Sequence, residues 1–143
     1  MRHLTLRRSQ RGIGLIDGLV ALAVLAFGLL AMTRFQSRLV AQSTESQQRV
    51  AAMQFGDELL STALVDVGNA ACYTLPQQGA CNSAPAQARA DDWSLRTLAA
   101  LPGSPTAGVA LDTANNRLTV TITWTGRHAS ETRTMQMATD VTP

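Results

Sequence analysis

Lysine is missing from the sequence, and charged and aromatic side chains are few. None of the 143 positions holds lysine; charged residues make up 15% of the chain and aromatic residues 4%. The chain therefore has no Schiff-base nucleophile and no phosphate-binding lysine of the Walker type. Its apolar content of 45% is too high for a disordered protein. The length predicts one domain.

Positive charge is scarce beyond the first twelve residues. The formal net charge is +2, but those twelve residues hold four arginines and no acid, whereas the other 131 hold eight arginines against ten acids. Nucleic-acid binding by a broad surface needs clustered cations on the folded part of a protein. The sequence therefore predicts no nucleic-acid partner.

Motifs of catalysis and metal binding are also missing. The sequence has no Gly-x-Ser-x-Gly, zinc-binding or phosphate-loop motif, and its two histidines are His3 and His128. We expect His128 to be a solvated loop residue. Asp91 and Asp92 are adjacent, so on a helix they do not face each other, and we expect one of them to be a helix cap. The sequence predicts a protein that is not an enzyme and has no cofactor or metal.

One long apolar run follows the basic segment. Sixteen of residues 13–32 are apolar, and a helix of this length spans roughly 30 Å, the thickness of a bilayer core. The preceding arginines predict a cytoplasmic N-terminus and, in a Gram-negative-type cell, a periplasmic C-terminal part. A cleaved secretory signal, a twin-arginine signal or a plain single-pass anchor would fit parts of this pattern. None of them explains Asp17, a carboxylate inside the apolar run.

The residues around Asp17 resemble the signal of type IV pilins and pseudopilins. That family has Gly-Phe-Thr/Ser-Leu-Ile-Glu where this chain has Gly-Ile-Gly-Leu-Ile-Asp at residues 12–17. The resemblance implies that a membrane prepilin peptidase removes residues 1–12 by cutting between Gly12 and Ile13 and then methylates the new amine of Ile13. It also implies that Asp17 pairs with this amine on a neighbouring subunit during assembly. The alternative role for Asp17 is to cap the start of the helix.

Shorter stretches resemble the PilV family of minor pilins. They are the apolar segment 22–32 with its Phe-Gly-Leu-Leu core, Asp92-Trp93, the Leu-Pro-Gly at 101–103 and the strand-like segment 121–125. This resemblance implies a subunit that joins other minor pilins and the major pilin on the inner-membrane assembly platform. Such a subunit primes the type IV pilus and presents a tip adhesin, which serves twitching motility and adhesion. Alternatives are a minor pseudopilin of type II secretion and a membrane-anchored periplasmic binding domain.

A single long helix is predicted from Ile13 to about Val67, roughly 80 Å in length. Its first part, 13–32, would lie in the membrane or filament core, and 33–68 would continue as an amphipathic helix that stops at Gly68-Asn69. The apolar stripe predicted to face the rest of the protein consists of Leu39, Val50, Met53, Leu60, Leu64 and Val67.

Residues 69–143 are predicted to form a small periplasmic α+β head. Cys72 and Cys81 favour a disulfide over a metal site, because further ligands are lacking and the periplasm is oxidising. Segment 90–101 predicts a helix capped by Asp91 or Asp92, with Trp93, Leu98 and Leu101 buried. Strands are predicted at 109–111, 117–125 and 131–141, with a turn at Asn115-Asn116 and a loop at 126–130. The expected fold class is α+β and pilin-like: a long N-terminal helix packed against about three antiparallel strands.

Overall fold

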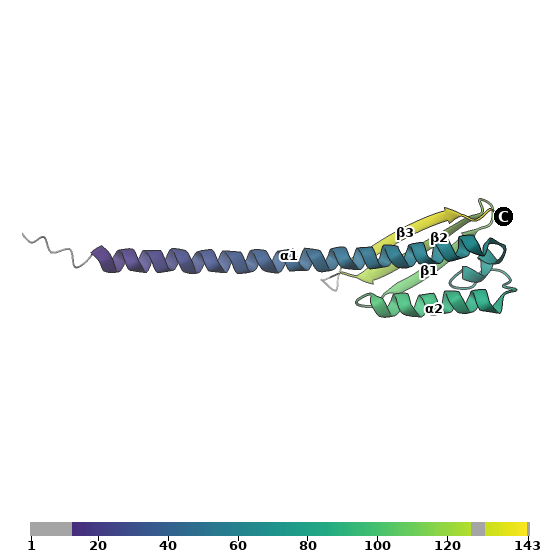
Figure 1. Cartoon of the computed structure of the whole chain (residues 1–143), viewed down its shortest axis with the longest axis horizontal. Coiled ribbons are helices and arrows are strands. Elements are labelled where there is room, and N and C mark those ends of the chain that lie inside the picture. The colour runs from purple at the N-terminus through teal and green to yellow at the C-terminus, as the bar shows by residue number, and fades with distance from the viewer. Residues whose placement is uncertain (1–12, 127–130, 143) are drawn as a thin grey trace, which may run out of the picture. The chain divides into compact units, whose positions relative to one another are not determined.

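The structure is a computed structural model that describes residues 13–126 and 131–142. In chain order the elements are α1 (Ile13–Val65), the 3-10 helix η1 (Val67–Tyr73), α2 (Ala84–Ala100), β1 (Thr106–Asp112), β2 (Arg117–Thr125) and β3 (Thr132–Asp140) (Figure 1). The predicted α+β class, with a long N-terminal helix and a small antiparallel sheet, is confirmed. The chain divides into two compact units, Met1–Ala41 and Gln42–Pro143.

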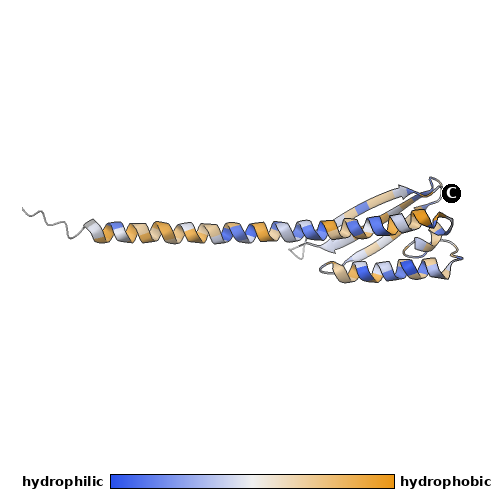
Figure 2. Cartoon of the chain, viewed as in Figure 1, coloured by the Kyte–Doolittle hydropathy of each residue, from blue (hydrophilic) through white to orange (hydrophobic). Residues whose placement is uncertain are grey.

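In the first unit the described residues belong to α1 alone. Large apolar side chains are exposed all along this part of the helix, from Leu15 at 77% to Val40 at 67%. Figure 2 shows mostly apolar colours here, and more polar colours farther along α1. In the described part of the chain, α1 is the one helix long and apolar enough to cross a membrane.

In the second unit, which we call the head, three antiparallel strands form a sheet in the order β1-β2-β3. In the central register, Val120 of β2 lies between Val109 of β1 and Met137 of β3. The predicted turn is confirmed: Asn116 has a φ of 50°, a left-handed conformation that asparagine tolerates. The bounds of β2 agree with the prediction, whereas β1 is longer than expected and β3 is one residue shorter at each end.

The core lies between one face of the sheet and the two helices, α2 and the part of α1 within the head (Figure 1). The alternation in β2 places Leu118, Val120 and Ile122 on this face, each 0% exposed, while the threonines between them face outward. Trp93 and Trp124 are buried in the same core. The sheet therefore covers the helix with its apolar side, as the pattern predicts.

The predicted apolar stripe of α1 is largely wrong. Of its members only Leu60 is buried, whereas Val50, Met53 and Leu64 are 45–47% exposed. The buried face of α1 is built from small residues and two leucines: Ala52, Gly56, Leu59, Leu60 and Ala63. A Cβ added at Gly56 would lie 2.9 Å from Met135 Cε and 3.0 Å from Met137 Sδ, so the sheet approaches the helix backbone closely here.

The predicted start and cap of the second helix are also wrong. Helix α2 begins six residues before the expected segment, and Ser83 is its cap: the Ser83 hydroxyl accepts a hydrogen bond from the Ala86 backbone N–H at 3.4 Å. Proline in the first turn suits this position because its missing N–H would have had no helical partner. Asp91 and Asp92 lie inside α2 and are exposed. Trp93 and Leu101 are buried as predicted, whereas Leu98, which was predicted to be buried with them, is half-buried.

The long helix ends slightly earlier than predicted. Helix α1 stops at Val65, and η1 follows, so Gly68 and Asn69 lie within η1. Asn69 has φ −113° and ψ 21°, which breaks the helical geometry. The predicted loop at 126–130 falls mostly on residues 127–130, including His128, which lie outside the described residues.

Candidate functional site

The candidate site in the first unit is the apolar part of α1, with a single carboxylate near its start. Gly12 and the side chain of Ile13 lie outside the described residues; the helix itself begins at Ile13. Asp17 is exposed, and it forms no ion pair among the described residues. The sixteen residues from 18 to 33 carry no charge. At 1.5 Å per residue they make an uncharged helical segment about 24 Å long, close to the thickness of a bilayer core.

Polar side chains at the C-terminal end of this segment form hydrogen bonds with the backbone of the same helix. The Thr33 hydroxyl donates to the Leu30 carbonyl oxygen at 2.9 Å, and the Ser37 hydroxyl donates to the Thr33 carbonyl oxygen at 3.0 Å. Such bonds satisfy hydroxyl groups where water is scarce. Arg34 and Arg38 are the first charged residues after the uncharged segment.

Two glycines of the apolar segment share one face of α1. Gly14 and Gly18 are four residues apart, which places them on one face of α1, and nothing lies within 4 Å of a Cβ added at either. Small residues at this spacing let the backbones of two helices approach closely. The spacing is visible in the sequence, and it lies beside Asp17.

In the head, the Arg96 guanidinium joins the two helices. It donates to Glu58 of α1 at 2.7 and 3.1 Å and to Asp92 of α2 at 2.8 Å. The hydrogen bonds to Glu58, followed by the one to Asp92, raise the pKa of Arg96 above its ordinary value. Asp92 pairs with Arg96 four residues along the same helix and is not the helix cap that the sequence predicts, whereas the interhelical ion pair is Arg96–Glu58.

A second polar cluster surrounds Asp66, directly after α1. The Asp66 carboxylate accepts hydrogen bonds from the Asn69 side chain at 2.7 Å and from the Tyr73 hydroxyl at 2.9 Å, and Arg89 of α2 lies 3.6 Å away. The Asn69 bond, then the Tyr73 bond and the Arg89 charge, lower the pKa of Asp66. Burial raises the pKa of Tyr73. The cluster ties the end of α1 to η1 and α2.

Cys72 and Cys81 are brought together as predicted. Their sulfur atoms lie 2.03 Å apart in a disulfide, and Cys72 is 2% exposed. The loop between them runs along the outer edge of β1: Leu75 and Val109 exchange two backbone hydrogen bonds, of 2.9 and 2.8 Å. The disulfide therefore closes a loop that covers one edge of the sheet.

A metal site is not expected from the sequence. Within residues 13–126 and 131–142, no group of three or more His, Cys, Asp or Glu side chains could hold a metal ion. His3 and His128 lie outside these residues. The clusters at Arg96 and Asp66 join structural elements to one another.

No protein-family model, curated protein or solved structure matches this chain. The feature that demands a partner is the apolar part of α1, because exposed apolar surface of this extent is unfavourable in water. A lipid bilayer, or a bundle of similar helices, would cover it.

Proposed function

We propose that this chain is a minor pilin that anchors in the inner membrane and then enters a type IV pilus through its N-terminal helix. The observation that carries the proposal is the exposed, neutral segment of α1, which bears Asp17 at its start and follows a basic leader that ends in Gly12. A plain anchor accounts for the apolar segment and the arginines but not for the acid. The resemblance to the signal of the pilin family accounts for all three.

In this proposal the leader first holds the helix in the membrane. Its four arginines favour the cytoplasmic side, so the head lies in the periplasm, where its disulfide is stable. Prepilin peptidase cuts between Gly12 and Ile13, and glycine before the cut leaves the backbone unhindered. The cut removes the four positive charges and creates an amine at Ile13, which the enzyme methylates.

The new amine gives Asp17 a partner on another subunit. At about 4 Å and an effective dielectric near 20, such a pair gains roughly 4 kcal/mol before the cost of desolvation is subtracted. Pairing also removes an isolated carboxylate from an apolar environment, which is costly by itself. Helix packing, assisted by the close approach at Gly14 and Gly18, supplies the remaining contact. The partners would be other minor pilins and the major pilin on the assembly platform, with a tip adhesin presented beyond them.

Replacement of the Asp17 carboxylate tests this mechanism. We expect Asp17→Ala to insert into the inner membrane at the wild-type level but to enter sheared pili at least about tenfold less, because a lost charge pair of more than 1.4 kcal/mol changes an equilibrium tenfold. Asp17→Glu, which keeps the charge, is the matched control and should be incorporated. Immunoblots of membrane and pilus fractions measure both quantities. Normal incorporation of Asp17→Ala would overturn the pairing mechanism.

A deletion strain separates the pilus from a secretion system that would use a similar helix. The proposal predicts loss of twitching and of surface fibres, with exported enzymes still released normally. Retention of those enzymes in the periplasm, with twitching unchanged, would instead assign the chain to type II secretion.

A further inference from the structure

Strand β3 is an edge of the sheet, and its outer side is open. The strand order β1-β2-β3 leaves β3 with β2 as its one strand partner among the described residues. The Gly126 N–H donates to the Glu131 carbonyl oxygen, and the Val141 N–H donates to the Asn116 carbonyl oxygen. Because antiparallel pairs alternate, these two bonds place the odd-numbered residues of β3 in hydrogen-bonded pairs with β2.

The even-numbered residues of β3 therefore direct their backbone groups away from the sheet. For four of them, Thr132, Thr134, Gln136 and Ala138, no backbone N–H or C=O group on this side has a partner within the described residues. The strand contains no proline, and among Thr132–Asp140 its charged residues are Arg133 and Asp140. Native edges are often blocked by proline, by charged side chains or by covering segments. Residues 134–139, between Arg133 and Asp140, are uncharged and contain no proline, so among the described residues this stretch is open to pairing.

The opposite edge of the sheet is covered. On β1 the alternation directs odd-numbered residues outward; Val109 exchanges backbone bonds with Leu75, and the Leu111 N–H donates to the Gln78 side chain at 3.2 Å. Both partners belong to the loop closed by the disulfide. The head therefore has one protected edge and one free edge.

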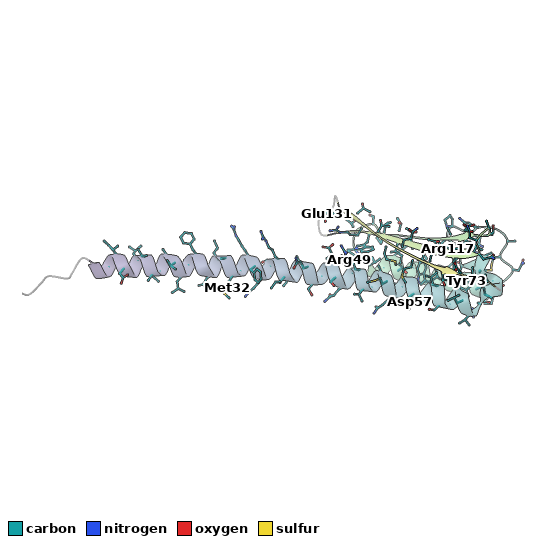
Figure 3. All side chains as sticks on the ribbon, turned by 90° about the horizontal axis from the view of Figure 1, so that it is seen from above. Met32, Arg49, Asp57, Tyr73, Arg117 and Glu131 are labelled. Atoms are coloured by element: carbon teal, nitrogen blue, oxygen red, sulfur yellow. A yellow bond between two sulfur atoms is a disulfide. The ribbon has the colours of Figure 1, made fainter. Side chains whose placement is uncertain are left out.

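A groove of about 570 Å³ runs along the free edge. Consecutive residues 132–136 of β3 line it, so side chains from both faces of the strand take part, as expected of a groove at the strand edge. Arg49 and Met53 of α1 form the opposite wall, and Trp124 of β2 completes the lining. Figure 3 shows Arg49 on α1 and Glu131, just before β3, at the same end of the head.

Two hydrogen-bond donors in the groove lining lack an acceptor among residues 13–126 and 131–142. They are the Nε1–H of Trp124, which is 3% exposed, and the buried Nε–H of Arg133. Two carboxylates already balance the two arginines: Glu45 lies 3.0 Å from Arg49 and 2.9 Å from Arg133, and Glu131 lies 2.8 Å from Arg133. An occupant therefore needs acceptor oxygens but no net charge. Peptide carbonyl groups meet that requirement, whereas a hydrocarbon chain does not.

We propose that the groove binds an extended, uncharged peptide segment of a partner protein, which adds to the sheet as a fourth strand beside β3. Backbone groups of residues 132–138 pair with the segment. Its inward side chains are apolar, because Met53, Met135 and Trp124 line the inner wall. Its outward side chains are small and hydroxylated, because they extend a face occupied by threonines of β2 and β3. The inference concerns the head alone and does not depend on filament assembly.

The test uses the full chain in detergent micelles and a capped, fluorescein-labelled peptide of three Thr-Val repeats. We expect a saturable rise in fluorescence anisotropy. Thr134→Pro removes one outward N–H without removing a bond to β2, and it should weaken binding at least about tenfold. Thr134→Val keeps the N–H, and it is the matched control that should bind like the wild type. Thermal unfolding of both variants checks that the head remains folded.

A second measurement needs no variant. The same peptide with every backbone nitrogen methylated has no donors, so its binding to the wild-type chain should be lost. Equal binding of the methylated peptide, equal binding by Thr134→Pro, or no binding of the parent peptide would each overturn the proposal. A wild-type chain that is dimeric in detergent and becomes monomeric with Thr134→Pro would assign the edge to a second copy, and it would overturn the proposal as well.

Discussion

Trp93 of α2 donates a hydrogen bond from its indole nitrogen to the backbone carbonyl oxygen of Phe55 on α1, at 2.7 Å. The indole is 1% exposed, so this bond lies inside the core. A helical carbonyl has a second lone pair and can accept it without giving up its own helical bond. The hydrogen bond fixes the orientation of α2 relative to α1, and burial of the indole adds an apolar contact between the two helices.

Trp93→Phe should therefore destabilise the head. The variant loses the hydrogen bond and part of the buried ring, and we expect the free energy of unfolding to fall by about 1–3 kcal/mol. Urea titration of the full chain in detergent, followed by the fluorescence of Trp124, measures the change. Leu95→Ala is the control, because Leu95 lies on the same helix and is 69% exposed. A wild-type midpoint for Trp93→Phe would contradict the role given to this bond.

The stability of the head should fall in acid through Asp66. Its pKa in the folded protein lies below the ordinary value of 3.8, first because of the Asn69 hydrogen bond. At pH values between the folded and the unfolded pKa of Asp66, the unfolded chain binds more protons than the folded chain. The contribution of Asp66 to stability is therefore complete above about pH 3.8 and is lost as the pH falls through the folded pKa. The pKa of Asp112 is lowered too, and it adds to the same trend.

Asp66→Asn separates this contribution from the others. We expect the variant to be less stable than the wild type at pH 7, with the difference shrinking below pH 3.8. Asp57→Asn is the control: Asp57 is exposed on α1 and has no hydrogen bond or ion pair within the described part of the chain (Figure 3). Urea titrations at pH 7 and below pH 3.8 measure the free energy of unfolding of each variant. A difference that stays constant with pH would rule out the Asp66 cluster as the cause.

Removal of the disulfide should loosen the covered edge of the sheet. Cys72 and Cys81 are nine positions apart, and for a loop of this length the chain-entropy estimate is a loss of about 3 kcal/mol when both are replaced by alanine. Hydrogen exchange at the amides of Leu75 and Val109 should accelerate, while exchange in the β2–β3 hairpin changes less. Reductant should have no further effect on the double variant. Unchanged exchange at Leu75 would show that the loop holds β1 without the disulfide.

Local patterns in the sequence predicted the parts of the fold that depend on near neighbours. The alternation of threonine with apolar residues identified β2 to the residue, since one face of an antiparallel strand is buried. The presence of two cysteines, Cys72 and Cys81, predicted the disulfide between them. The N-terminal apolar run predicted the exposed part of α1, because twenty largely apolar residues indicate a helix that is apolar on every face.

Features set by contacts distant in sequence were missed. Large side chains suggested the wrong face of α1, because the sheet packs on Ala52, Gly56 and Ala63, whose small size lets it come close. The start of α2 was missed because its first turns bury alanines, which give little apolar contrast. The open edge of β3 depends on strand order and on what covers β1, and no single segment encodes either.

The mass of the N-terminus of the protein extracted from membranes tests the central claim most directly. Intact-mass and N-terminal peptide spectra from wild-type cells and from cells without prepilin peptidase should differ by the leader of residues 1–12 and one methyl group. The account predicts a chain that begins at methylated Ile13 when the peptidase is present and at the uncleaved N-terminus when it is absent. An intact Met1 in wild-type cells, or a cut at any other bond, would contradict it.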